Sequence, residues 1–470
     1  MSIDHYTSAR DQAAAVRERR ISARELLQLH LARIDAVNPR VNALVSVNPE
    51  RAMQTAAAAD ERLARGEPLG ALHGLPFAVK DTHHLSGWRT TCGSPTMSDH
   101  VSTYDDLHVE RVLAAGAVPV AKSNVPEFAA GSHTFNPIFG ATLNPFDLTR
   151  SAGGSSGGAA AALATGMVAL ADGSDMGGSL RNPASFNNVV GLRPGFGRVP
   201  VWPTWNMFET INVVGPLARD VGDLALLLSV LAGPDDRVPT ASHLPGTTFA
   251  PPLPDTGVNG LRVALSIDLG DAFAVDTDVV TVIAAMGDAL SNAGATVQAD
   301  HPNLDGAEDA FRTLRAWLFH STLGDLNARH PGVMKASLIA NIEAGAPLTG
   351  ADVARGHAQR TELAERMRRF FTRHDVLALP VSQVPPFPAD QEFPTEINGE
   401  IQATYLDWMR SAFLITVTGC PAISVPAGFT SSGLPVGLQL VGPAGSERRL
   451  LEIAHAVEML TGAGQRRPLL

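Results

Sequence analysis

Two glycine- and serine-rich segments in the first half of the chain have a composition suited to nucleophilic catalysis. The first contains Gly153-Gly-Ser-Ser-Gly-Gly158 and the second is Gly173-Ser-Asp-Met-Gly-Gly-Ser179, with an alanine-rich stretch at 159–164 between them. Glycine permits positive φ angles and leaves room for several backbone N–H groups to converge on one point. A serine at the end of such a loop can attack a carbonyl carbon while those N–H groups stabilise the oxyanion. The pattern therefore indicates acyl transfer by a serine.

Other interpretations of these segments compete with this one. A flexible linker rarely flanks a strong helix and a second glycine turn, and a phosphate-binding loop requires a Gly-Lys-Ser/Thr sequence that is absent. Gly153-Gly-Ser-Ser-Gly157 does fit the nucleophile elbow of α/β-hydrolases. That elbow needs a hydrophobic strand directly before it, whereas residues 144–150 predict a loop. It also needs a histidine partner, and none of the downstream histidines lies in a supporting motif: His320, His374 and His455.

Short apolar segments alternate with helical segments along the rest of the chain. Strands are predicted at 76–80, 117–121, 261–267, 376–380 and 422–426, and helices at 108–115 and 276–293. This alternation is typical of an α/β layer fold. Lys80 stands at the end of the first predicted strand.

The N-terminal region reads as helical. Ser22-Ala-Arg-Glu25 has the form of a capping box, and its helix is predicted to end at Asn38-Pro39. Asn48-Pro49 opens another helix that reaches Gly66. We predict that residues 1–66 form a helical cap packed on a main α/β domain at 67–470, with the whole chain forming one structural domain.

Several segments in this order resemble the amidase signature family. They are Pro76-Phe-Ala-Val-Lys-Asp81, Asn144-Pro-Phe-Asp147, the two glycine–serine segments, Gly191-Leu-Arg-Pro194, Gly419-Cys-Pro-Ala-Ile-Ser-Val-Pro-Ala-Gly428 and Leu434-Pro-Val-Gly-Leu-Gln439. The resemblance is strong over 70–232, good over 410–443 and weak over 235–400. It implies a large mixed β-sheet covered by helices on both faces. Ser174 replaces the more usual threonine and keeps its hydroxyl, whereas Asn182 is a departure with no evident meaning.

The resemblance also implies roles for particular residues. Lys80 would be the base, Ser155 a bridging serine after a cis Gly154–Ser155 bond, and Ser179 the nucleophile; the two serines are 179 − 155 = 24 positions apart. The oxyanion hole would consist of the backbone N–H groups of Met176, Gly177, Gly178 and Ser179. A lysine base must be neutral, so its pKa must lie well below about 10.4. Burial at the end of an apolar strand lowers it.

This chemistry requires no metal and no organic cofactor. His83 and His84 are adjacent, lack the i, i+4 spacing of a helical metal-binding pair, and are interpreted as surface or loop histidines. The predicted reaction is cleavage of a C–N bond in small amides, anilides or carbamates through an acyl-enzyme. A glutaminase subunit of a tRNA-dependent amidotransferase and a catalytically inactive binding protein remain alternatives.

The candidate substrate-binding residues are Ala129, Trp202, Trp205 and Phe208, with Met207, Tyr405 and Trp408 as further apolar candidates. Ordinary core packing explains the large apolar side chains about as well as a substrate pocket does.

The bulk composition excludes several classes of partner. The net charge is −11, so a nucleic-acid partner has no general electrostatic support. No uncharged apolar run of membrane-spanning length and no apolar N-terminal segment occur. Two cysteines are too few for a disulfide framework. We expect a cytoplasmic monomer or homodimer that binds a small amide or carbamate and neither nucleic acid nor membrane.

Overall fold

A single large mixed sheet runs through the centre of the molecule, whose computed structural model describes residues 3–470. Its eleven strands lie in the order β1-β3-β2-β8-β10-β9-β16-β17-β13-β11-β12. Strand β2 is parallel to β3 and β8, and β11 is parallel to β12 and β13, while the remaining neighbours are antiparallel. The mixed α/β sheet predicted from the sequence is therefore confirmed.

The strands of this sheet are β1 (Leu44–Val45), β2 (Pro76–Lys80), β3 (Val118–Ser123), β8 (Leu170–Asp175), β9 (Val190–Arg193), β10 (Val213–Ala218), β11 (Arg262–Leu265), β12 (Thr296–Ala299), β13 (Val376–Pro380), β16 (Ala422–Phe429) and β17 (Pro435–Val441). Three small hairpins lie outside it: β4 (Phe135–Asn136) with β5 (Gly140–Ala141), β6 (Leu143–Asn144) with β7 (Asp147–Ser151), and β14 (Glu396–Ile397) with β15 (Glu400–Ile401).

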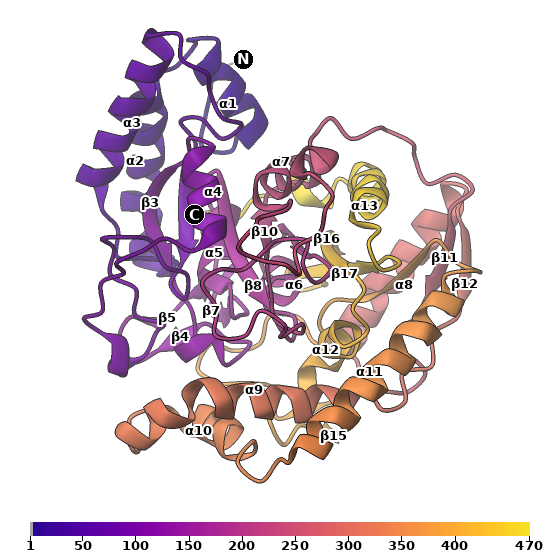
Figure 1. Ribbon diagram of the computed structural model, residues 1–470. Coiled ribbons are helices and arrows are strands. Elements are labelled where there is room, and N and C mark those ends of the chain that lie inside the picture. The colour runs from indigo at the N-terminus through magenta and orange to yellow at the C-terminus, as the bar shows by residue number, and fades with distance from the viewer. Residues whose placement is uncertain (1–2) are drawn as a thin grey trace.

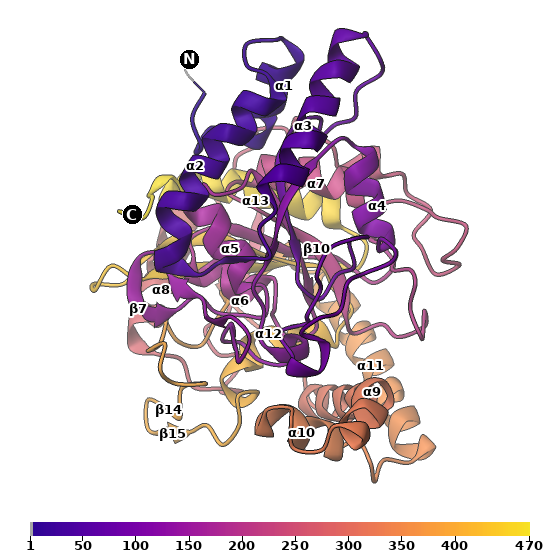
Figure 2. The same cartoon turned by 90° about the vertical axis from the view of Figure 1, so that its left-hand side faces the viewer.

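Helices surround the sheet, as Figures 1 and 2 show. They are α1 (Ala9–Arg17), α2 (Ala23–Val41), α3 (Pro49–Ala64), α4 (Leu107–Ala114), α5 (Gly157–Ala164), α6 (Arg181–Phe186), α7 (Val221–Leu231), α8 (Thr277–Asn292), α9 (Ala307–Arg329), α10 (Ala336–Glu343), α11 (Gly350–Phe370), α12 (Arg410–Thr416) and α13 (Glu447–Thr461). Helices α1 to α3 gather at one end of the molecule, and α9 to α11 gather at the opposite end (Figure 1). The N-terminal helices pack on the main body, since α2 contacts β2, α3 contacts β3 and α1 contacts α7.

Two local predictions differ from the structure. Helix α2 continues past Pro39 to Val41 and ends there because Asn42 takes a left-handed conformation with φ 54°. The stretch 144–150, predicted as a loop, contains most of the β6–β7 hairpin. That hairpin forms because Leu143 pairs with Ser151 and Asn144 with Asp147, away from the main sheet.

The buried centre brings the candidate residues together. Strand β2 is buried along its whole length, and so is the alanine-rich helix α5. Because β2 and β8 are parallel neighbours, with Ala78 opposite Ala171, their carboxyl ends meet at one edge. Lys80 at the end of β2 therefore lies beside the loop that follows Asp175 at the end of β8.

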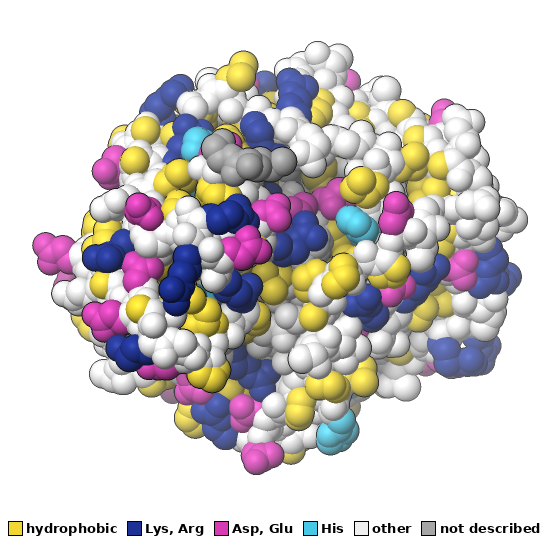
Figure 3. Space-filling model, turned by 90° about the horizontal axis from the view of Figure 1, so that it is seen from above, with side chains coloured by type: hydrophobic (Ala, Val, Ile, Leu, Met, Phe, Trp, Pro, Cys, Tyr) yellow, Lys and Arg dark blue, Asp and Glu magenta, His cyan; other side chains and the backbone are white. Residues whose placement is uncertain are grey.

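The face seen from above in Figure 3 carries basic and acidic side chains interspersed with one another, without a broad basic area. Among the described residues, no helix has the combination of length and apolar character that crossing a bilayer requires.

Candidate active site

Lys80 is the centre of a buried cluster of hydroxyl groups. Its Nζ donates to Ser155 Oγ at 2.8 Å, to Ser156 Oγ at 2.9 Å and to Ser174 Oγ at 3.0 Å, and the lysine has no exposed surface. The Gly154–Ser155 peptide bond is cis. Ser174, which stands where a threonine was expected, thus does present its hydroxyl to the lysine. Three hydroxyl oxygens can accept the three N–H bonds of a charged amine. When the amine is neutral, it can instead accept a proton from one of the hydroxyls.

Burial lowers the pKa of Lys80 to about 7, although the nearby carboxylates of Asp172 and Asp175 act in the opposite direction. The reason is that burial penalises the charged form of an amine. At neutral pH about half of such a lysine is free to accept a proton. A hydroxyl in contact with it can therefore pass a proton to the amine.

A glycine makes room for the cluster. A Cβ atom at Gly173 would lie 2.6 Å from Ser156 Oγ, so any larger residue would displace this hydroxyl from Lys80. Sequence reasoning did not identify Ser156 as a partner of the lysine. Its position directly after Ser155 was the available signal, but sequence alone does not tell which of two neighbouring serines points inward.

The second loop, Met176–Ser179, borders the same pocket as Ser155. Ser179 is half-buried and lines this pocket together with Ser155, Met176 and Gly177. Ser156 N–H donates to the Ser179 carbonyl at 3.2 Å and so ties the two loops together. Within residues 3–470 the Ser179 and Ser155 hydroxyls make no hydrogen bond with each other. Such contacts are often long before substrate binds.

The four N–H groups expected to form an oxyanion hole are not equivalent. Gly178 N–H donates to Asp175 Oδ1 at 3.0 Å and is therefore already engaged. Among the described residues, the N–H groups of Met176, Gly177 and Ser179 have no such partner. Gly178 has φ +113°, and a Cβ there would lie 2.7 Å from the Ala412 Cβ, so only glycine suits this turn. The loop thus offers three N–H donors rather than four.

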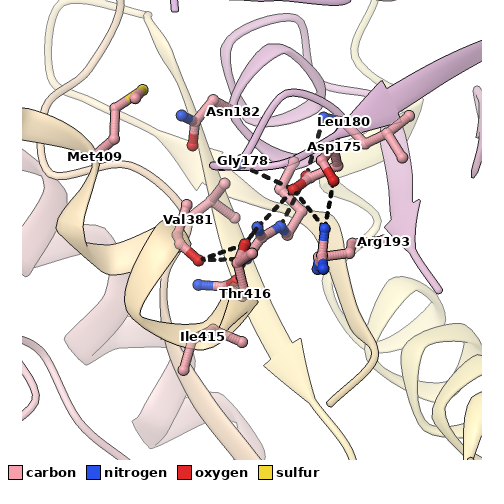
Figure 4. A network of polar contacts seen from close by, with 12 residues as sticks. Asp175, Gly178, Leu180, Asn182, Arg193, Val381, Met409, Ile415 and Thr416 are labelled. Atoms are coloured by element: carbon pink, nitrogen blue, oxygen red, sulfur yellow. Dashed lines mark hydrogen bonds and ion pairs between the residues drawn. The ribbon is translucent and has the colours of Figure 1, made fainter. Parts of the chain in front are cut away.

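A buried ion-pair network fixes the loop from behind (Figure 4). Asp175 accepts from Arg181 Nη2 at 2.8 Å and Nε at 3.0 Å, from Leu180 N–H at 3.1 Å, and pairs with Arg193 at 3.4 Å. Burial opposes the ionisation of Asp175, but the two arginines outweigh it and hold the pKa of this carboxyl well below its usual range.

Arg181 extends the network to the C-terminal part of the chain. It donates to the Ala412 carbonyl at 2.9 Å, to Thr416 Oγ1 at 2.9 Å and to Gln439 Oε1 at 2.5 Å. Arg193 and Gln439 lie in segments that resemble the family, but the sequence indicated no role for either residue. In the structure both hold the loop that carries Ser179.

A second polar cluster lies behind Lys80. His83 does lie in the loop after β2, as interpreted from the sequence, but it is buried and not a surface residue. His83 is only 6% exposed, because its Nδ1 lies 2.6 Å from Asp172 Oδ2 inside the protein. His108 Nε2 lies 2.9 Å from the same oxygen, and Asp172 Oδ1 accepts from Lys80 N–H at 2.7 Å. Burial lowers the pKa of His83 to about 4 despite Asp172. Burial also opposes the ionisation of Asp172, but the two histidines outweigh it and keep the pKa of Asp172 low.

His83, His108 and Asp172 are the one group of three in the described chain whose ligand atoms lie close enough to share a metal ion, within 4.8 Å of one another. Two imidazoles and a carboxylate are ligands that divalent transition metals accept. Two hydrogen bonds between the imidazoles and Asp172 account for the same distances without an ion.

The pocket in front of Ser155 and Ser179 has a volume of about 520 Å³. Ala129, Trp205, Met207 and Tyr405 line it, as expected for substrate-binding candidates. Trp202 does not, because it packs with Leu107 and lies under Arg237, whose Cζ is 4.7 Å from its ring. Phe208 is 67% exposed and also lies outside the lining, while Trp408 is fully buried core.

One wall of the pocket comes from a region without recognisable motifs. Helix α9 contributes Arg315, Leu318, Phe319, Thr322 and Leu323. Sequence reasoning missed all of them, because the resemblance is weak over 235–400. Both cysteines are free thiols, and Cys92 lines the pocket.

Comparisons with known proteins agree with this geometry. The Amidase family profile matches residues 25–451. An acylamidase of Rhodococcus erythropolis is 34% identical over 99% of this chain and 97% of its own length. The A-subunit of a glutamyl-tRNA(Gln) amidotransferase of Synechococcus sp. is 35% identical over 95% of both chains. The crystal structure of a bacterial aryl acylamidase of the amidase signature family superimposes with a TM-score of 0.91 at 28% identity, covering 99% of this chain and 98% of the other. The chain therefore belongs to the amidase signature family and is an amidohydrolase that acts on carbon–nitrogen bonds.

Proposed function

We propose that the protein is a stand-alone hydrolase of small amides, anilides or carbamates that uses Ser179, Ser155 and Lys80 in acyl transfer. The observation that carries this proposal is the buried Lys80 amine, hydrogen-bonded to Ser155 Oγ at 2.8 Å, on a pocket that Ser155 and Ser179 both line. An isolated serine hydroxyl is a weak nucleophile, and a neighbouring base activates it.

In the proposed first step, Ser179 Oγ attacks the carbonyl carbon of the substrate. Its proton passes to Ser155, whose own proton passes to neutral Lys80. The N–H groups of Met176, Gly177 and Ser179 face the oxyanion that forms, and removing one such donor typically costs about 10²–10³ in rate. The proton then returns through Ser155 to the departing amine, because an amine leaves readily only when protonated.

In the second step, water attacks the acyl-enzyme. It gives its proton to Lys80 by the same route, and Lys80 returns a proton through Ser155 to the Ser179 oxygen as that oxygen leaves. The product is a carboxylic acid, or a carbonic acid monoester when the substrate is a carbamate that has lost its amine. Asp175 and Arg181 keep the loop in place throughout, since their charges are buried and paired at 2.8 Å. All of these steps use groups of the chain and water.

The pocket lining favours substrates with an apolar group. Phe128, Met176, Trp205, Met207, Leu318, Phe319, Leu323 and Met409 all contribute to it. Similarity over nearly full length to an acylamidase supports the same class of substrate. Anilides and N-aryl carbamates release an aniline, which leaves more readily than an alkylamine.

The identity of 35% to the A-subunit of an amidotransferase gives the second candidate, a glutaminase that works within a complex. Assay of the purified chain distinguishes the two. We expect turnover of an acetanilide, a benzamide or an aryl carbamate by the chain alone, as a monomer or homodimer, and no turnover by Ser179→Ala. Glutaminase activity that appears only after a partner protein is added would overturn the proposal. Failure of a serine-directed fluorophosphonate to label the chain would indicate an inactive binding protein.

A further inference from the structure

Helix α9 places a buried guanidinium on the wall of the candidate substrate pocket. Arg315 is 5% exposed and lines the pocket with Met176, Phe319 and Tyr405. In the described part of the chain it is the only lysine or arginine in the lining, and Glu209 is the only aspartate or glutamate. The pocket therefore has one permanent positive charge.

Arg315 has neutral hydrogen-bond partners. Its Nη2 donates to Tyr405 OH at 2.5 Å, its Nε to Asn341 Oδ1 at 3.1 Å and its Nη1 to Met176 Sδ at 3.0 Å. No carboxylate oxygen of residues 3–470 lies within ion-pair distance of it. A guanidinium has five N–H groups and a thioether is a weak acceptor. One N–H on each terminal nitrogen is left without an acceptor.

Other arginines buried around the site have counter-ions. Arg181 pairs with Asp175 at 2.8 Å and Arg198 pairs with Glu447 at 2.8 Å. Glu209, the acidic residue of the lining, accepts instead from the N–H groups of Ile211 and Asn212 at 2.6 and 3.2 Å. A buried charge without a counter-ion is costly to maintain. Arg219 is also buried without a counter-ion, but it donates to two backbone carbonyls and lies outside the pocket. Arg315 instead faces a cavity with N–H groups left over, as expected for a site that an external anion completes.

The guanidinium is held in place before any ligand arrives. Its Cζ lies 4.2 Å from the centre of the Phe319 ring. Asn341, which accepts from Nε, is itself fixed by donating to the Ser337 carbonyl at 2.6 Å. A planar guanidinium fixed in this way loses little freedom when it binds a carboxylate through two parallel hydrogen bonds.

Arg315 lines the same pocket as Ser155 and Ser179. Its contact with Met176 joins it to the first residue of the Met176–Ser179 loop. We propose that Arg315 binds a carboxylate of the substrate, so that the preferred substrates are amides or anilides with an acidic group. This inference rests on the proposed function and narrows its substrate class.

The test compares matched substrate pairs. In the first pair, succinic acid monoanilide has a carboxylate in its acyl part that butyranilide lacks. In the second pair, 4-acetamidobenzoate has a carboxylate in its amine part that 4-methylacetanilide lacks. We expect the wild type to prefer the acidic member of one pair, and that pair shows which side of the scissile bond faces Arg315. Arg315→Met should lower kcat/KM for the acidic member about 10- to 150-fold, as expected for hydrogen bonds between charged groups. The neutral member should change less than about threefold.

Two variants control the experiment. Arg315→Lys keeps the charge without the planar fork and should lose only part of the preference. Arg329→Met removes an exposed arginine in the last turn of the same helix and should behave as the wild type. Equal losses on acidic and neutral members, or no preference in the wild type, would overturn the inference, because they indicate a purely structural arginine.

A binding measurement separates this inference from the proposed function. Benzoate should bind the wild type more tightly than benzamide does, and Arg315→Met should abolish that difference. If no amide, anilide or carbamate is hydrolysed, the proposed function fails while the benzoate titration still decides the role of Arg315. Equal binding of benzoate by wild type and Arg315→Met would refute the carboxylate site even if anilides are hydrolysed.

Discussion

The pH dependence of kcat/KM tests the role of Lys80 most directly. Burial lowers the pKa of Lys80 to about 7, and only its neutral form accepts a proton. The neutral fraction is then about 0.1 at pH 6, about 0.5 at pH 7 and about 0.9 at pH 8. We therefore expect kcat/KM to rise about tenfold between pH 6 and pH 8 and to level off above that range.

The assay uses a neutral anilide at constant ionic strength, so that the substrate does not titrate. His83 does not interfere, because burial lowers its pKa to about 4. Asp223 is the control, because burial and the neighbouring Asp220 raise its pKa to about 7, although Arg10 lies against it. It accepts from the N-terminal end of α1 and lies outside the pocket lining. Asp223→Asn should therefore leave the acid limb of the profile where it is.

Two outcomes would refute the reasoning. A profile that is flat or falls between pH 6 and pH 8 would show that no lysine with a pKa of about 7 acts as the base in the free enzyme. If the rise of kcat/KM between pH 6 and pH 8 disappears in Asp223→Asn, the group that titrates is the Asp223 carboxyl between α1 and α7 and not Lys80.

Four further predictions concern the residues around the site. Ser179→Ala should lower turnover by at least about 10³-fold with an unchanged circular dichroism spectrum, and a variant that keeps a tenth of the activity would disprove the nucleophile. Lys80→Ala and Ser155→Ala should each cost several orders of magnitude and the double variant little more, whereas additive losses in steady-state kinetics would exclude one proton relay. Dialysis against EDTA should leave activity unchanged; loss that Zn²⁺ restores would show that the His83 cluster holds a required ion. Arg181→Met should lower the free energy of unfolding in urea by about 3–5 kcal/mol, since it removes the two shortest ion-pair contacts of the buried Asp175 carboxylate and leaves Arg193 at 3.4 Å as its remaining ion pair, and an unchanged midpoint would contradict this.

The sequence predicted the elements that local rules determine. The strand that ends at Lys80 and the capping box at Ser22 both form, because apolar runs and capping residues act over a few positions. Helix α2 was predicted too short: the helix tolerates the bond that Pro39 cannot make, and Asn42 N–H still donates to the Asn38 carbonyl at 2.7 Å beyond it. The expectation of one large sheet with both parallel and antiparallel strands came from the family resemblance and not from any local pattern.

The site was predictable only where motifs mark it. Lys80 and the two serine loops carry such motifs, and β2 and β8 bring them together. His83 lies in a loop as predicted, but its burial and its pairing with Asp172 at 2.6 Å were not predicted, because a histidine next to another histidine carries no sign of a partner 89 positions away. No sequence motif marked Arg315. The spacing of apolar residues in a helix such as α9 can indicate which face is buried, but it does not indicate which pocket that face lines.

The contacts of Arg181 have a consequence for synthesis of the protein. Besides Asp175, the groups that accept from it are Ala412 O, Thr416 Oγ1 and Gln439 Oε1, and these three come from the last part of the chain to leave the ribosome. A nascent chain that already contains Lys80, Ser155 and Ser179 therefore lacks the partners that complete the support of its nucleophile loop. Hydrolytic activity should accordingly appear only after translation has passed Gln439, and chains interrupted before that point should be released inactive.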